Sequence, residues 1–196
     1  SITASNGAAN LNVTKVQTPS RIVVPSQANI ELGKWSIAAA NSNITLRKIT
    51  FQTVDPTTGA AITNLGTFNN LALYDGTTLL ATASNVNSNI VFSGFSSVIV
   101  NGTAKVYTLK GNTAVSGVFS GNKTVSFVVK SDSLADLDAR NTAGISLGSA
   151  SINFNTVSNN GPTEFRFAAS NPNLYHDAFP VISSVSFGNS LSLSPQ

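Results

Sequence analysis

Few residues of this chain have side chains that could carry out a reaction. The one histidine, His176, lies in the polar segment 173–177, without the strained serine turn that a hydrolase dyad requires. The eight Asp and Glu residues fall mostly in predicted turns and offer no carboxylate pair for glycoside hydrolysis. No glycine-rich loop follows a predicted strand and opens a helix, as a phosphate-binding loop would. We therefore expect a protein that is not an enzyme and that has no organic cofactor.

One connection concentrates three of the eight acids, Asp132, Asp136 and Asp138. Calcium takes about six to eight oxygen ligands and accepts irregular loops, so these carboxylates could hold one ion together with Asn141 and backbone carbonyls. The spacing differs from that of an EF-hand loop, which has Gly at its sixth position and Glu at its twelfth. These residues are the predicted metal ligands if the protein binds calcium.

The alternative for the same segment is a short helical turn over residues 133–139. Asp132 or Ser133 would then be the N-cap, and Asp136 would lie near the positive end of the helix dipole. A helix of this length needs tertiary contacts to be stable. The two interpretations predict different roles for the same carboxylates.

Aromatic residues could present a platform for sugar rings. Trp35 alternates with Ile37 and Ala39, which places it in a core rather than on such a platform. Tyr74 and Tyr175 lie beside predicted turns and are the residues we expect at a sugar-binding surface, if there is one.

The sequence contains four Asn-x-Thr acceptor patterns for N-glycosylation. They begin at Asn12, Asn43, Asn101 and Asn122. Asn101 and Asn122 lie at predicted turns, where a glycan can be accommodated, whereas Asn43 starts a predicted strand and is the poorer acceptor.

The composition points to the outside of a cell. Ser, Thr and Asn make up 70 of the 196 residues, only 10% of residues are charged, and Cys and Met are absent. Ordinary domains are about 25% charged, so solubility here depends on hydroxyl and amide groups. A chain without oxidisable sulfur suits an oxidising environment. The initial Ser1 fits either a removed signal segment or simple loss of Met.

Charge and hydropathy exclude two classes of partner. The net charge of +3 comes from 11 basic and 8 acidic residues that form no run of either sign, which argues against nucleic acid. No segment approaches the roughly 18 apolar residues of a membrane span, so we expect no membrane insertion.

Apolar residues recur at every second position, which is the period of a β-strand. Gly33 stands at a change of parity and indicates a bulge, and a second slip falls between Leu46 and Ile49. Turns are predicted at residues 55–59 and at Asp75-Gly76, the latter between alternating apolar runs.

The second half continues the same pattern. Short strands within residues 98–129, separated by the turns 101–102, 111–112 and 121–122, are predicted to form a meander, with further strands after residue 145. Roughly ten or more mostly antiparallel strands imply an all-β fold, a single β-sandwich or jelly roll.

A resemblance supports this class. The segments 21–25, 33–41 and 44–51, followed by Leu-Ala-Leu-Tyr-Asp-Gly at 71–76, resemble β-sandwich modules of prokaryotic secreted and surface-layer proteins. The chain is also similar to the subunits of donor-strand filaments. These resemblances cover about half of the chain and imply a structural role at a surface, with no catalytic residue to carry over.

The first residues suggest how such subunits could assemble. Residues 1–10 are small and polar and lead into the alternating Leu11 and Val13, so residues 1–16 are predicted as an extension that could complete a neighbour's sheet, with the sandwich over 17–196. The alternative is an ordinary first strand that pairs within its own domain. An intramolecular isopeptide bond from Lys34 beside Glu31 or Glu164 would also suit a thiol-free fibre.

Together these observations predict a non-catalytic structural subunit of an extracellular filament or surface lattice. Its partners would be copies of itself, joined by strand donation. The alternatives are an adhesive module that binds carbohydrate or surface glycans, and a viral decoration or fibre protein.

Overall fold

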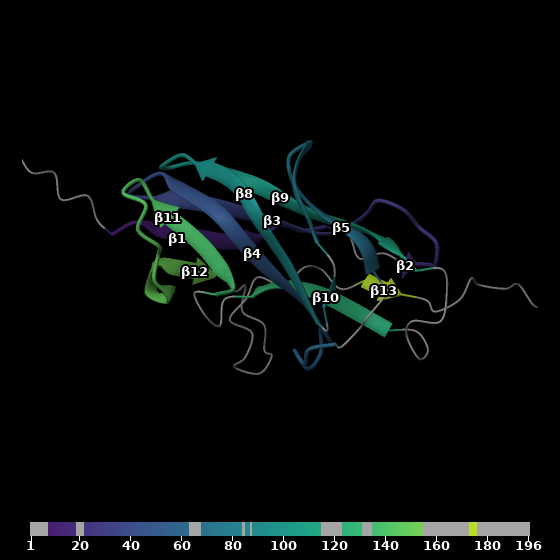
Figure 1. Ribbon diagram of the computed structural model, residues 1–196. Coiled ribbons are helices and arrows are strands. Elements are labelled where there is room, and N and C mark those ends of the chain that lie inside the picture. The colour runs from purple at the N-terminus through teal and green to yellow at the C-terminus, as the bar shows by residue number, and fades with distance from the viewer. Residues whose placement is uncertain are drawn as a thin grey trace, which may run out of the picture.

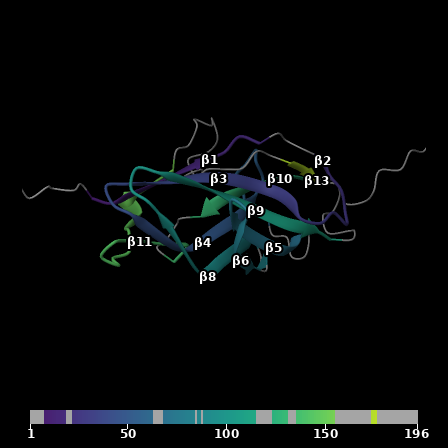
Figure 2. The same cartoon turned by 90° about the horizontal axis from the view of Figure 1, so that it is seen from above.

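The computed structural model describes residues 8–18, 22–62, 68–83, 85–86, 88–114, 123–130, 135–154 and 173–175. These residues form two β-sheets that face each other, as the sequence predicted (Figure 1). The strands run along the long direction of the molecule, with β11 at one end and β2 and β13 at the other (Figures 1 and 2). The one helical element in the described ranges is a 3-10 turn, Ser149–Ser151.

The first sheet has six strands in the order β12-β1-β3-β9-β5-β6. They are β12 (Ile152–Phe154), β1 (Asn10–Lys15), β3 (Ile30–Ala40), β9 (Ala104–Thr113), β5 (Phe68–Asp75) and β6 (Thr78–Ala83). All neighbours are antiparallel except β12 and β1.

The second sheet has seven strands in the order β2-β13-β10-β4-β8-β7, with β11 also paired to β4. They are β2 (Ile22–Val23), β13 (Asn173–Tyr175), β10 (Lys123–Lys130), β4 (Ile44–Val54), β8 (Asn89–Ile99), β7 (Asn85–Val86) and β11 (Leu137–Asn141). Strand β4 is long enough to pair with β10 through its second half and with β11 through its first half.

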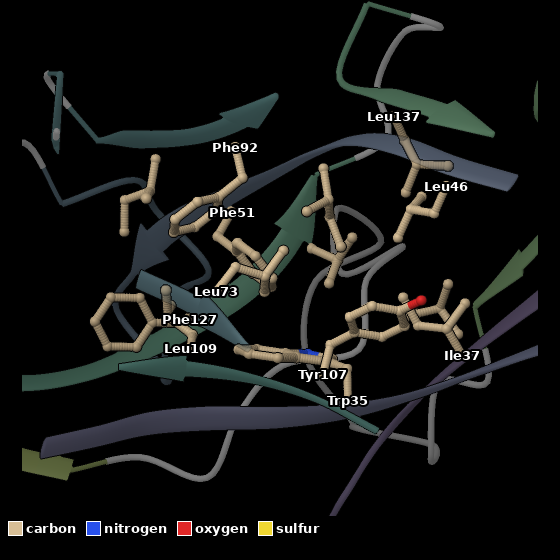
Figure 3. Close-up of a cluster of buried hydrophobic side chains, with 14 of the residues drawn as sticks. Trp35, Ile37, Leu46, Phe51, Leu73, Phe92, Tyr107, Leu109, Phe127 and Leu137 are labelled. Carbon is tan, nitrogen blue, oxygen red and sulfur yellow. The ribbon is translucent and has the colours of Figure 1, made fainter. Parts of the chain in front are cut away.

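A core of aromatic and aliphatic side chains joins the two sheets (Figure 3). Phe51 of β4 lies 4.6 Å from Trp35 of β3 and 5.9 Å from Phe92 of β8, measured between ring centroids. Phe68 of β5 similarly meets Phe127 of β10 at 5.3 Å. The prediction that Trp35 belongs to the core is confirmed, because its side chain is fully buried.

Several predicted turns and bulges are present, but the turn predicted at 111–112 is wrong, because both residues lie inside β9, where Gly111 pairs with Ile30 and Asn112 with Asn69; the turn predicted at 121–122 lies outside the described residues. The Asp75-Gly76 turn joins β5 to β6, and Gly76 adopts a φ of 59°. Asp55 caps its turn by accepting the N–H groups of Thr57 and Thr58. The register between β3 and β9 shifts at Gly33, which confirms the bulge.

The meander predicted for residues 98–129 is wrong. Strands β8 and β10 belong to the second sheet, whereas β9 between them belongs to the first. The Asn101-Gly102 turn does reverse the chain, but it docks on β3, where Gly102 donates to the Ala39 carbonyl and Ala39 donates to the Thr103 carbonyl. A turn sequence predicts that the chain reverses its direction, but it does not predict which sheet the next strand joins.

The predicted helical turn is also wrong where the structure describes it. Residues 137–141 form β11, with Leu137 and Ala139 buried and Asp138 between them facing outward. This alternation has the period of a strand, and the free side of β4 supplies the hydrogen bonds that a short helix would have had to make internally. Residues 133 and 134 lie outside the described residues.

Candidate functional site

Strand β1 is held between β3, the next long strand of the chain, and β12, which is distant from it in sequence. It pairs antiparallel with β3 in an unbroken register from Asn10↔Ala40 to Lys15↔Trp35. On its other side it pairs in parallel with β12, only through residues 11–13. Asn153 of β12 also donates its side-chain N–H to the side-chain oxygen of Asn12, at 3.1 Å. The outer side of β1 is therefore covered by a strand of three residues.

The two residues predicted for an inter-subunit strand anchor β1 in the core. Leu11 and Val13 are both fully buried and belong to the main hydrophobic cluster. Burying an aliphatic side chain of this size stabilises the fold by about 1.5 to 3 kcal/mol. In this chain the strand completes its own sheet, and the division of the sequence at residue 16 stays a prediction.

The predicted glycosylation acceptors differ in their surroundings. Asn101 is exposed at the turn after β8. Asn43 is exposed too, but its side-chain oxygen accepts the backbone N–H of Asn101 at 2.8 Å. Asn12 is half-buried beside Asn153. Asn122 lies outside the described residues, and glycosylation at all four positions stays a prediction.

Two of the three predicted metal ligands are engaged by cations. Asp138 accepts two hydrogen bonds from Nε of Arg140, at 2.9 and 3.3 Å, and one from Nη2. Asp136 lies 3.5 Å from Nζ of Lys130. Asp132 is outside the described residues, and within the described ranges no three acids, histidines or cysteines gather as metal ligands would. The calcium site stays a prediction.

The two predicted sugar-platform tyrosines come from different sheets. Tyr74 of β5 is half-buried, with Nζ of Lys110 4.9 Å from its ring centroid. Tyr175 belongs to β13 in the other sheet, and its side chain is outside the described part. Their joint role stays a prediction.

Other residues considered for chemistry are placed as follows. Lys34 is partly exposed and forms an ion pair of 2.6 Å with Glu31 on the same strand, whereas Glu164 and His176 lie outside the described residues. Residues 144–148 are Gly-Ile-Ser-Leu-Gly, which has the spacing of a hydrolase nucleophile turn and was not among the predicted sites. In the structure Ser146 is exposed and bridges Arg140 beyond the end of β11, without the strand-to-helix turn of that motif.

A groove on the outer face of the second sheet was not predicted. The registers of β4 with β8 and of β4 with β11 both shift at Arg47, and β8 carries Gly94 at a φ of 78° at the same level. Bulges bend a strand and redirect its side chains, and they are frequent beside functional sites. Two adjoining open depressions of about 390 and 440 Å³ lie here, and both are lined by Arg47, Ser96 and Arg140.

Part of this groove could have been found in the sequence. The parity slip between Leu46 and Ile49 is visible in the sequence, and the bulge at Arg47 lies inside it. The partner bulge at Gly94 and the approach of β11 depend on contacts between residues some 50 to 90 positions apart, which periodicity does not report.

Two ionisable side chains have shifted pKa values. The hydrogen bonds and the charge of Asp138 raise the pKa of the Arg140 guanidinium, which stays a cation. Burial raises the pKa of the Tyr107 hydroxyl to about 12; its 2.8 Å hydrogen bond with Ser97 lowers this pKa, and the charge of Asp75 raises it further. Tyr107 is therefore a neutral core residue at physiological pH.

Comparisons with known proteins add little. No protein-family model matches the chain, and no curated protein matches it. Among solved structures, the chain is similar to BslA, described as a bacterial hydrophobin, with 12% identity, 90% of this chain and 98% of that chain covered, and a TM-score of 0.28. A score this low supports no conclusion about function. No helix among the described residues is long and apolar enough to cross a membrane.

Proposed function

We propose that the protein is a non-catalytic structural subunit of an extracellular filament or surface lattice, and that its subunits join by exchanging β1. The observation that carries this proposal is the position of β1. It lies between β3, the next long strand, and β12, where Leu11 pairs with Ile152 near the other end of the described chain, and it is joined to β2 through residues 16–21.

Exchange of β1 would preserve every contact that it makes. The slot for β1 is formed by β3 on one side and the three residues of β12 on the other. A strand from a second copy would bring the same Leu11 and Val13 into the same core positions. Because the contacts are identical, the exchange changes the free energy only through the connecting segment and the entropy lost when two molecules associate, which is why strand swapping is a low-cost route to assembly at high concentration.

If β1 left its own sheet, the remaining fold would need a strand from another copy to take its place. The edge of β3 would expose unpaired backbone groups along the whole length of β1, and the core would lose two buried side chains. An open edge of this kind is a template for pairing with another chain. The composition, with 10% charged residues and neither Cys nor Met, supports an extracellular location.

Cysteine pairing between chains tests this proposal, because the protein has no cysteine of its own. Thr14 of β1 and Ser36 of β3 are opposite each other in the register. Opposite residues of antiparallel strands have Cα atoms about 4.5 to 5.5 Å apart, within the range of a disulfide. The variants Thr14→Cys and Ser36→Cys are purified separately, unfolded, refolded together at high concentration and oxidised.

Strand exchange predicts a covalent Thr14→Cys to Ser36→Cys dimer on a non-reducing gel. The matched control mixes Ser36→Cys with Val106→Cys, which is opposite Ser36 on β9 and is not exchanged. If the first mixture gives no more dimer than the control, β1 stays in its own chain and the proposed assembly is wrong.

A further inference from the structure

The groove at the bulge of Arg47 has a concentration of positive charge that is unusual for this chain. Arg47, Lys48 and Arg140 line it, and the one acid in the lining is Asp138. Asp138 is hydrogen-bonded to Arg140, so two positive charges stay uncompensated. Within the part of the chain described, neither Arg47 nor Lys48 has an ion-pair partner.

The two guanidinium groups are arranged differently. Asp138 binds Nε and Nη2 of Arg140, which holds that side chain in place and leaves Nη1 available. Arg47 projects from the bulge as an exposed side chain with its whole fork available. A planar guanidinium matches a carboxylate with two parallel hydrogen bonds. Since both arginines line both depressions, an anionic group between them would meet both.

The rest of the lining is neutral and hydrogen-bonding. Thr45 lies at one end of the groove, Ser93 at the other, and Ser96 in the shared middle. Exposed Val98 lines one depression, and the largely buried Phe95 lines the other, so both add apolar contact. Hydroxyl groups around a small apolar surface match the alternating hydroxyls and C–H faces of a sugar chain, and the open shape suits a polymer that crosses the sheet.

We propose that this groove binds an acidic polysaccharide, with a uronate carboxylate held between Arg47 and Arg140 and sugar hydroxyls on Thr45, Ser93 and Ser96. Two net charges are too few for nucleic acid, which is held by neutralising many phosphates along a basic surface. This site is on the second sheet and is separate from β1, so the proposal does not depend on strand exchange.

The test measures binding of the full chain to polygalacturonate by isothermal titration calorimetry. We expect binding to polygalacturonate and none to its methyl ester, which keeps the sugar backbone and masks the carboxylates. Arg47→Gln should weaken binding about tenfold or more, the loss expected when a charge-assisted pair is removed. Arg47→Lys should retain part of the affinity, because it keeps the charge and loses the fork.

The matched control is Lys110→Gln, which removes one positive charge from the other sheet and should leave binding unchanged. Thermal melting of each variant shows that it is folded. Three outcomes overturn the proposal: no binding to polygalacturonate, equal binding to the methyl ester, or equal losses from Arg47→Gln and Lys110→Gln. Equal binding to polyglutamate would show a site for acidic protein segments instead and would also overturn it.

Discussion

The outer faces of the two sheets differ in shape and in charge, although one chain builds both. On the first sheet, β1, β3 and β9 run side by side, and small neutral residues fill the outer positions of this part of the face. These residues are Asn12, Thr14, Ser36, Ala38, Ala104 and Val106. On the second sheet, bulges interrupt β4, β8 and β11 at one level, and the charged groove lies there.

The cations of the two sheets also differ in their partners. On the first sheet Lys34 pairs with Glu31 and Lys105 with Asp75, each at 2.6 Å, and Lys110 lies over the Tyr74 ring. In the groove, Arg47 and Lys48 are unpaired among the described residues. Both sheets contain bulges, but two cations of the first sheet form ion pairs, whereas the coincident bulges of the second sheet bring together two cations that the described acids leave unpaired.

The largest loss of stability is expected in the core that the two sheets share. Phe51→Ala removes the ring that contacts both Trp35 and Phe92 and should lower the free energy of unfolding by about 3 to 5 kcal/mol. Urea denaturation checks this value. Val98→Ala, at a side chain that is 47% exposed, is the control and should change stability by less than about 0.5 kcal/mol. Two separate unfolding transitions for the wild type would show that the sheets are independent.

The next largest change in stability is expected at high pH, because of the buried hydroxyl of Tyr107. Its pKa is about 12 in the folded protein and 10.0 in an unfolded chain, so above pH 10 the unfolded chain loses this proton first. The stability that Tyr107 contributes is present below pH 10 and falls as the pH rises toward 12, by about 2 to 3 kcal/mol. Urea denaturation from pH 9 to 12 measures the loss. Tyr107→Phe should lack it, and an identical slope in that variant would contradict the assignment.

A smaller loss of stability is expected when a side chain is placed at the left-handed backbone position of the bulge. Gly94 has a φ of 78°, and a Cβ there would meet no atom within 4 Å. Gly94→Ala should therefore cost about 1 to 2 kcal/mol through backbone conformation alone. Thermal unfolding compares it with Ser93→Ala, for which we expect almost no change. Equal stability of both variants would mean that the left-handed backbone at Gly94 is not retained.

The smallest expected change in stability distinguishes a paired cation of the first sheet from an unpaired cation of the groove. Lys105→Met breaks the ion pair with Asp75 and should cost about 0.2 to 1 kcal/mol, as partly exposed pairs do. Arg47→Met removes an unpaired cation and should cost nothing. Denaturation at low salt shows the difference, which disappears near 1 M salt because charges are then screened within about 3 Å. A larger cost for Arg47→Met would mean that the fold uses this charge.

Sequence patterns were sufficient for local features and insufficient for long-range ones. The period-two alternation and the Asp75-Gly76 turn depend on neighbouring residues, so the strands and this hairpin were predictable. The assignment of β9 to the sheet opposite β8 depends on the docking of residues 101–103 on Ala39, some 60 positions away. The groove was missed for the same reason, because it forms only when β11 reaches Arg47.

The prediction for the two buried residues of β1 was correct in part. Leu11 and Val13 were correctly identified as a strand with one apolar face, and both are buried. Their partner was left open, because the alternation of a strand shows which side faces a core and does not show which copy of the chain supplies that core.

The central claim, that assembly proceeds through β1, is tested most directly by locking this strand. In the double variant Thr14→Cys/Ser36→Cys, oxidation of the dilute monomer joins β1 to its own β3, and a reductant releases it. Electron microscopy of concentrated samples should show ordered polymers from the reduced protein and none from the oxidised protein. Polymers that form equally well from the oxidised monomer, or a reduced protein that stays monomeric, would contradict this account.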